Sequence, residues 1–199
     1  MVDLEIEELK NGLLKCFNNS KSLLNDADYL FEDKRFARAY SIYRLSIEEN
    51  QKSNMLIRLI IEKMINKDFN KEEKTYYNKF FTNHLLKIKA SAIEEYTFID
   101  FFNKYNLKLD KNIEQIFNQR SNPRQIDILK QYGFYTHLIN KKFKKPSDFI
   151  SNEKCQKIQQ ESKLSLSKSR TFIEMFLTSP DVFIRKFTNV DFSIYKDIT

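Results

Sequence analysis

The sequence predicts an all-α protein built as a bundle of long antiparallel helices followed by short C-terminal helices. Only 2 Gly and 3 Pro occur in 199 residues. That is too few for the frequent turns of a β-sandwich or barrel, and for the glycine-rich loop of a dinucleotide-binding or P-loop fold. Hydrophobic residues make up 41 % of the chain, with 18 Phe and 10 Tyr, so a sizeable core can form. We expect one domain over residues 1–187 and a tail over 188–199.

Two long helices are expected at the start of the chain. Residues 3–32 carry apolar side chains mostly at helical spacing, which predicts the first of them. The sequence Glu-Asp-Lys at 32–34 predicts a short turn, and a second helix follows over about 35–65. Two long helices joined this tightly form an αα-hairpin.

The middle of the chain predicts further helices. Asn70, with a glutamate three residues later, is typical of an N-cap with its capping partner, and it predicts a third helix that runs to about Tyr105. Residues 110–118 predict a weaker helix. Another is predicted over 123–132, because proline occupies its first position.

The last third of the chain combines an irregular segment with two helices. Residues 133–150 lack helical periodicity, so we expect a loop or a short extended segment there. Ser151 can cap a long helix over about 152–178. A serine followed by a proline at 179–180 predicts a short last helix that ends near Lys186.

The positive charge of the protein is concentrated in one region. The chain has a net charge of +7, and residues 67–145 alone hold 16 Lys and Arg against 9 Asp and Glu. Such a local excess favours a polyanion or an acidic partner. A lysine-rich face that only contacts solvent explains it equally well. The region ends in four closely spaced lysines: Lys141, Lys142, Lys144 and Lys145.

Several classes of protein are disfavoured by what the sequence lacks. The 2 Cys and 2 His form no Cys-x-x-Cys pattern, so no zinc site and no other metal site or cofactor is predicted. No stretch reaches the ~20 apolar residues of a membrane span. The first residues are acidic and amphipathic, unlike a secretory signal. A cytoplasmic protein without membrane partners is the expectation.

A polar cluster interrupts the apolar stripe of the second helix. Glu48, Glu49 and Lys52 lie between apolar residues, with Arg38 upstream. Glu48 and Lys52 have the i, i+4 spacing of a helical ion pair. One interpretation is a structural polar network at a helix interface or cleft; the other is ordinary surface pairing.

A second cluster contains the residue best suited to proton transfer. His84 and Lys87 are three residues apart and share a face of the predicted third helix, with Lys79 about one turn before them. Histidine can exchange protons near neutral pH, and nearby lysines can stabilise charge on a phosphate. The alternative is that His84 is a hydrogen-bonded structural residue.

Five segments form an ordered pattern along residues 23–150. They are Asp26-Ala-Asp-Tyr-Leu, Arg35-Phe-Ala-Arg38-Ala-Tyr, Leu45-Ser-Ile-Glu48-Glu49-Asn-Gln-Lys52, Phe80-Phe81-x-x-His84-x-x-Lys87, and Leu129-Lys130-x-x-Gly133-x-Tyr135 with Lys145-Pro146 after it. This pattern resembles the AbiV family of abortive-infection proteins, which is related to the HEPN helical proteins.

The resemblance implies a bacterial phage-defence effector with a HEPN-like helical bundle. It also implies a homodimer, a phage-encoded activating protein, and a shutdown of translation or gene expression. Many HEPN proteins are metal-independent ribonucleases whose signature is Arg, four to six residues, then His. Here Lys79 occupies the position of that arginine before His84, and lysine offers a point charge where arginine offers a planar fork.

Three functional hypotheses follow. In the first, His84 residues of two chains exchange protons with RNA while Lys79 and Lys87 hold the phosphate, and Glu48, Glu49 and Lys52 keep the helices in register. In the second, the protein is a non-enzymatic binder whose basic region, with the four lysines at 141–145, sequesters a phage protein, RNA or a component of translation. In the third, it is a scaffold or antitoxin-like relative without toxicity.

Overall fold

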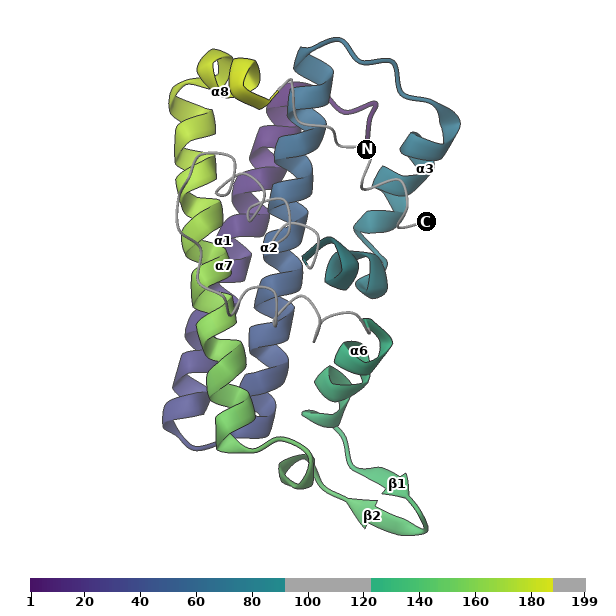
Figure 1. The fold of residues 1–199 in the computed structure, drawn as a ribbon, viewed down its shortest axis with the longest axis vertical. Coiled ribbons are helices and arrows are strands. Elements are labelled where there is room, and N and C mark those ends of the chain that lie inside the picture. Colours follow the sequence, from purple (N-terminus) through teal and green to yellow (C-terminus); the bar gives the residue numbers. More distant parts are fainter. Residues whose placement is uncertain (92–122, 188–199) are drawn as a thin grey trace.

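The structure is a computed structural model of the 199-residue chain, and it describes residues 1–91 and 123–187. Its long axis is formed by α1 (Ile6–Glu32), α2 (Phe36–Met64) and α7 (Asn152–Thr178), which lie side by side (Figure 1). α1 runs antiparallel to α2 and α7. The all-α class is therefore confirmed.

Helix α2 is the centre of the molecule, with 18 of its 29 residues buried. α1 and α7 cover one side of α2 (Figure 1). α3 (Lys71–Phe80), a helix that begins at His84 and is described to Ser91, and α6 (Pro123–Tyr132) lie on the other side. We call the helix of residues 84–91 the His84 helix. In this arrangement α3, the His84 helix and α6 cover the side of α2 that carries the buried residue Glu48.

Small polar residues let the three long helices approach closely. Ser20 of α1 donates to the carbonyl oxygen of Ser46 on α2 at 2.7 Å, and Ser46 donates to the carbonyl oxygen of Ser20 at 2.9 Å. Ser162 of α7 donates to the Ser46 hydroxyl at 3.2 Å. All three serines are buried, and their hydroxyls are paired, so the crossing carries no unpaired hydroxyl.

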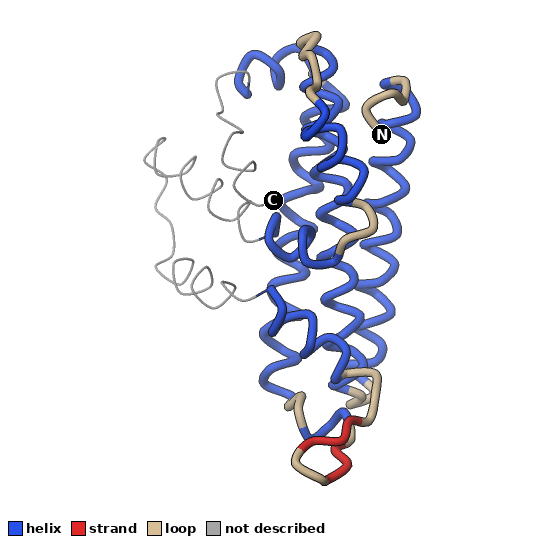
Figure 2. Tube along the Cα trace, turned by 90° about the vertical axis from the view of Figure 1, so that its right-hand side faces the viewer, coloured by secondary structure: helices blue, strands red, loops and turns tan. Residues whose placement is uncertain are grey.

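The chain between α6 and α7 forms a short β-hairpin. β1 (His137–Ile139) pairs antiparallel with β2 (Lys142–Lys144), and the short helix η1 (Pro146–Asp148) follows. The hairpin lies beyond the end of the long helices (Figures 1 and 2). α8 (Pro180–Phe187) follows α7 at the opposite end.

Most predicted elements agree closely with the structure. The capping box of Asn70 and Glu73 is formed, and Ser151 caps α7 as expected. The irregular segment 133–150 contains the hairpin. The continuous third helix was wrong: α3 ends at Phe80, residues 81–83 form a turn, and the His84 helix starts after it. The predicted end of the third helix near Tyr105, the predicted helix 110–118 and the tail 188–199 lie outside the described residues.

None of the helices in the described ranges combines the length and the apolar character that a membrane span needs.

Gly133 fixes the position of α6 on α2. A Cβ atom at Gly133 would lie 1.9 Å from the hydroxyl oxygen of Ser41 and 2.3 Å from the carbonyl oxygen of Ala37. The same Ser41 hydroxyl donates to the carbonyl oxygen of Lys130 at 2.6 Å. Only glycine allows this close approach of the two backbones. The approach places α6 next to the polar residues in the middle of α2.

Replacing each of the two glycines of the chain by alanine should therefore change the free energy of unfolding in opposite directions. Gly133→Ala forces α6 away from α2, so we expect a loss of about 1–3 kcal/mol in the free energy of unfolding. Gly12 lies inside α1, where an added Cβ meets only Leu56 at 3.4 Å. Gly12→Ala should stabilise the protein by about 0.5–1 kcal/mol, because alanine favours helix. Urea denaturation followed by circular dichroism measures both, and equal effects would contradict the docking role of Gly133.

Candidate functional site

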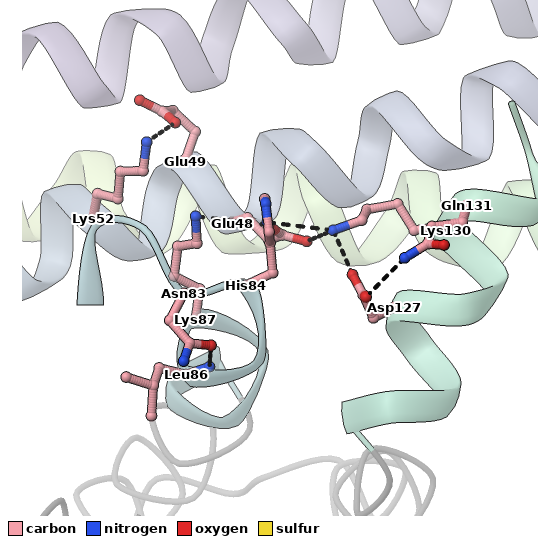
Figure 3. Close-up of polar contacts among 10 residues, drawn as sticks. All are labelled: Glu48, Glu49, Lys52, Asn83, His84, Leu86, Lys87, Asp127, Lys130 and Gln131. Atoms are coloured by element: carbon pink, nitrogen blue, oxygen red, sulfur yellow. Dashed lines mark hydrogen bonds and ion pairs between the residues drawn. The ribbon is translucent and has the colours of Figure 1, made fainter. Parts of the chain in front are cut away.

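A single buried carboxylate organises the polar centre of the molecule. Glu48, in the middle of α2, is 4 % exposed. Its Oε2 atom lies 2.5 Å from Nδ1 of His84, and its Oε1 atom accepts a hydrogen bond from Nζ of Lys130 at 2.6 Å. Figure 3 shows that these partners reach Glu48 from two different helices. One carboxylate thus joins α2 to the His84 helix and to α6.

Two buried lysines surround this carboxylate. Lys87 lies 3.9 Å from Oε2 of Glu48, and Lys130 forms a second ion pair with Asp127 at 2.8 Å. Burial lowers the pKa of Lys87 below its usual value, and the negative charge of Glu48 opposes this effect. The two buried lysines thus face the buried carboxylate of Glu48 and the partly exposed carboxylate of Asp127, so the charges compensate each other. We call Glu48, His84, Lys87, Asp127 and Lys130 the Glu48 cluster.

Local sequence explains why His84 and Lys87 reach the same carboxylate. The side chain of Asn83 accepts a hydrogen bond from the backbone N–H of Leu86 at 3.2 Å, which caps the start of the His84 helix (Figure 3). His84 therefore lies in the first turn, and Lys87 lies three residues later on the same face. On α6, Asp127 and Lys130 have the same spacing.

The geometry defines what the histidine can do. When Nδ1–H donates to the carboxylate of Glu48, the lone pair of the ring lies on Nε2. The side chain of His84 is 53 % exposed, whereas that of Glu48 is 6 % exposed. A buried carboxylate that orients an exposed imidazole is the arrangement used for general acid–base catalysis. The cluster has the chemical parts for proton transfer at the protein surface.

A small cavity lies next to the buried side of the cluster. It is lined by residues that include Arg44, Glu48, Lys87 and Ile126, and it has room for about one water molecule. A phosphodiester does not fit there, so a substrate that reacts with the cluster must approach the exposed ring of His84.

The structure separates the remaining predicted residues from this cluster. The predicted pairing of Glu48 with Lys52 was wrong, because Lys52 pairs with Glu49 at 2.7 Å, while Glu48 pairs with Lys130 and His84 (Figure 3). Arg38 is exposed, about three turns before Glu48. Lys79 is exposed in the last turn of α3, on a different helix from His84. The lysines at 141, 142, 144 and 145 are exposed on and beside the hairpin.

Two members of the cluster were not identified as site residues from the sequence. Lys130 belongs to one of the segments that form the family pattern, but no partner was assigned to it. The sequence does contain a signal, which is spacing: Lys130 lies four residues after Ile126 and three before Gly133 and so shares their face of the helix. The structure shows that this face is buried. Asp127 follows from Lys130 through its i, i+3 spacing.

Nothing in the described ranges groups three or more His, Cys, Asp or Glu side chains as a metal site requires. The two cysteines, Cys16 and Cys155, are free.

One family model matches this chain. It is a HEPN-type model described as AbiV, and it matches residues 8–166. The matched region contains all five residues of the Glu48 cluster as well as the hairpin. No curated protein and no solved structure matches the chain.

The burial of Glu48 predicts a large effect of removing its charge. Glu48→Gln leaves two buried lysines with less compensation, so we expect a loss of about 3–5 kcal/mol in the free energy of unfolding. Glu49→Gln is the matched control, since its pair with Lys52 is partly exposed, and there we expect less than about 1 kcal/mol. Urea denaturation measures both. Similar losses in the two variants would mean that Glu48 does not hold the helices together.

Proposed function

The chain belongs to the AbiV family of HEPN-type proteins, whose general role is abortive-infection defence, and we propose that it is an antiphage effector that cleaves RNA at His84. In this proposal it acts in the cytoplasm of a bacterium. A phage-encoded protein activates it, and RNA cleavage then shuts down translation or gene expression. The observation that carries the proposal is the hydrogen bond between buried Glu48 and exposed His84.

The proposed reaction needs only proton transfer and charge stabilisation. Nε2 of His84 accepts the proton of an RNA 2′-hydroxyl, whose oxygen then bonds to the adjacent phosphorus. The bond from phosphorus to the 5′-oxygen breaks, and that oxygen takes a proton from a second imidazolium. The products are a 2′,3′-cyclic phosphate and a 5′-hydroxyl. No metal is required in this scheme.

The proposal assigns different roles to the lysines of the region. Lys87 and Lys130 act through Glu48, because both are buried beside it. Their charges compensate that of the carboxylate, which holds the imidazole of His84. Lys79 is exposed and stays a candidate for binding the phosphate. Glu49 and Lys52 have a structural role as a separate pair on α2.

The second candidate function is binding without catalysis. It is favoured by Lys79, which replaces the arginine of the HEPN signature before His84. Here the basic surface sequesters a phage protein, RNA or a translation component, and the Glu48 cluster is only structural. A binder inhibits in proportion to its amount and is sensitive to salt, whereas an enzyme turns over many substrates.

Mutation of His84 separates these two functions. Cells that express the protein are infected with phage, and total RNA is compared between wild type, His84→Ala and the control Glu49→Gln. We expect discrete RNA fragments on infection in wild type and control, and none with His84→Ala. Lys130 and Lys87 remain beside Glu48 when the ring is removed, so the variant should still fold, which a thermal melt verifies. Protection with intact RNA in all three would favour the binding function.

The two-histidine scheme also predicts the oligomeric state. If one His84 accepts a proton while the His84 of a second chain donates one, the active protein is a homodimer. Light scattering after size-exclusion chromatography should then give twice the chain mass of 24.0 kDa. A monomer that still cleaves RNA would contradict the use of two histidines.

A further inference from the structure

The β-hairpin combines strong positive charge with exposed apolar side chains. Lys141, Lys142, Lys144 and Lys145 are all exposed, and no Asp or Glu occurs between Asp127 and Asp148. The hairpin is thus a cationic arm beyond the end of the bundle (Figures 1 and 2). Such an arm attracts a polyanion.

An aromatic side chain stands on one face of this arm. Leu138 and Phe143 are directly opposite each other across the two strands, and they are 63 % and 78 % exposed. By strand alternation, Lys142 and Lys144 lie on the other face of the ribbon. Tyr135, just before β1, is 63 % exposed. The arm therefore presents the ring of Phe143 to solvent on one face and the cationic side chains of Lys142 and Lys144 on the other, with Lys141 in the turn and Lys145 after β2.

The hairpin has a defined conformation before any partner binds. Asn140 and Lys141 have φ angles of 50° and 62°, as a type I′ turn requires. The ring of His137 packs on that of Tyr132, with 4.4 Å between centroids, and Tyr132 packs on Phe149 at 4.2 Å. These contacts attach the hairpin to α6 and to the segment after η1. A preorganised arm loses little conformational entropy on binding.

The arm is close to the Glu48 cluster along the chain. Lys130, which contacts Glu48, precedes His137 by seven residues, and seven residues span at most about 25 Å. A flexible strand that lies on the hairpin can therefore extend to the exposed ring of His84.

We propose that the hairpin of residues 137–144, with Lys145, is a docking arm for single-stranded RNA. One base stacks on Phe143, and the lysines contact the flanking phosphates. Unpaired bases offer free faces for stacking, whereas the bases of a duplex are already stacked. The strongly exposed apolar side chains here are few, namely Tyr135, Leu138 and Phe143, whereas a standard protein interface buries about 800 Å² per partner. The choice of RNA rests on the proposed function.

The test measures RNA binding separately from cleavage. Fluorescence anisotropy of a fluorescein-labelled 12-nucleotide single-stranded RNA is recorded with His84→Ala protein, which retains the hairpin. Adding Phe143→Ala should raise the Kd about 5- to 160-fold, the range for loss of one stacked base. Leu164→Ala, at an exposed site on α7, is the control and should leave the Kd unchanged.

The contribution of the lysines is measured by the salt dependence of the Kd. Replacing Lys142 and Lys144 together with Gln should reduce the slope of log Kd against log salt by about 1.4, since each phosphate contact to a single strand contributes about 0.7. Thermal melts of the variants should match the parent, because the changed side chains are exposed.

The outcomes distinguish this inference from the proposed function. Binding that depends on Phe143, in a protein whose wild type leaves RNA intact, supports the docking arm and contradicts the ribonuclease. Cleavage of RNA whose binding is unaffected by Phe143→Ala supports the ribonuclease and overturns the arm. Equal affinity for a duplex of the same length also overturns it. So does preferential binding of a polyglutamate peptide, which would indicate an acidic protein partner instead.

Discussion

The arrangement of this protein depends on one charge that is kept out of water. Glu48 lies on the most buried helix, and its carboxylate accepts from or pairs with side chains of the His84 helix and α6. An isolated carboxylate is costly to bury, so the segments that supply its partners must dock in one position. Apolar contacts alone tolerate small shifts of a helix, whereas a shift here breaks specific hydrogen bonds. The charge therefore selects one register for the covering helices.

The same constraint connects structure and function. The cations that compensate Glu48 are buried lysines, while the group it presents to solvent is an imidazole. A single carboxylate thus serves two purposes: it fixes the helices, and it orients a ring that can exchange a proton. Substitutions around Glu48 therefore need to be judged by stability as well as by activity. A variant that loses activity because α6 has shifted is not evidence for a catalytic group.

The fold was largely predictable because its signals are local. Helical spacing, caps at Asn70 and Ser151, and the proline at 123 define element boundaries within a few residues of sequence. The break at residues 81–83 was missed because apolar spacing continues across it, and the cap at Asn83 is a weaker signal than a proline. The site was only partly predictable. His84, Lys87 and Glu48 were singled out, but the partners of Glu48 are 36 to 82 residues away. Helical spacing therefore suggested Lys52 instead.

Because its members are far apart in the sequence, the Glu48 cluster can form only late in the synthesis of the chain. Glu48 comes from the first quarter of the chain, and Lys130 reaches it only when α6 has docked beside Gly133. A ribosome that has made the first 100 residues has produced Glu48 and His84 but not the lysine that completes their charge balance. The assembled cluster is consequently a property of the nearly finished chain. In the cell that makes this protein, its partly synthesised forms therefore lack the complete cluster, because they lack Lys130.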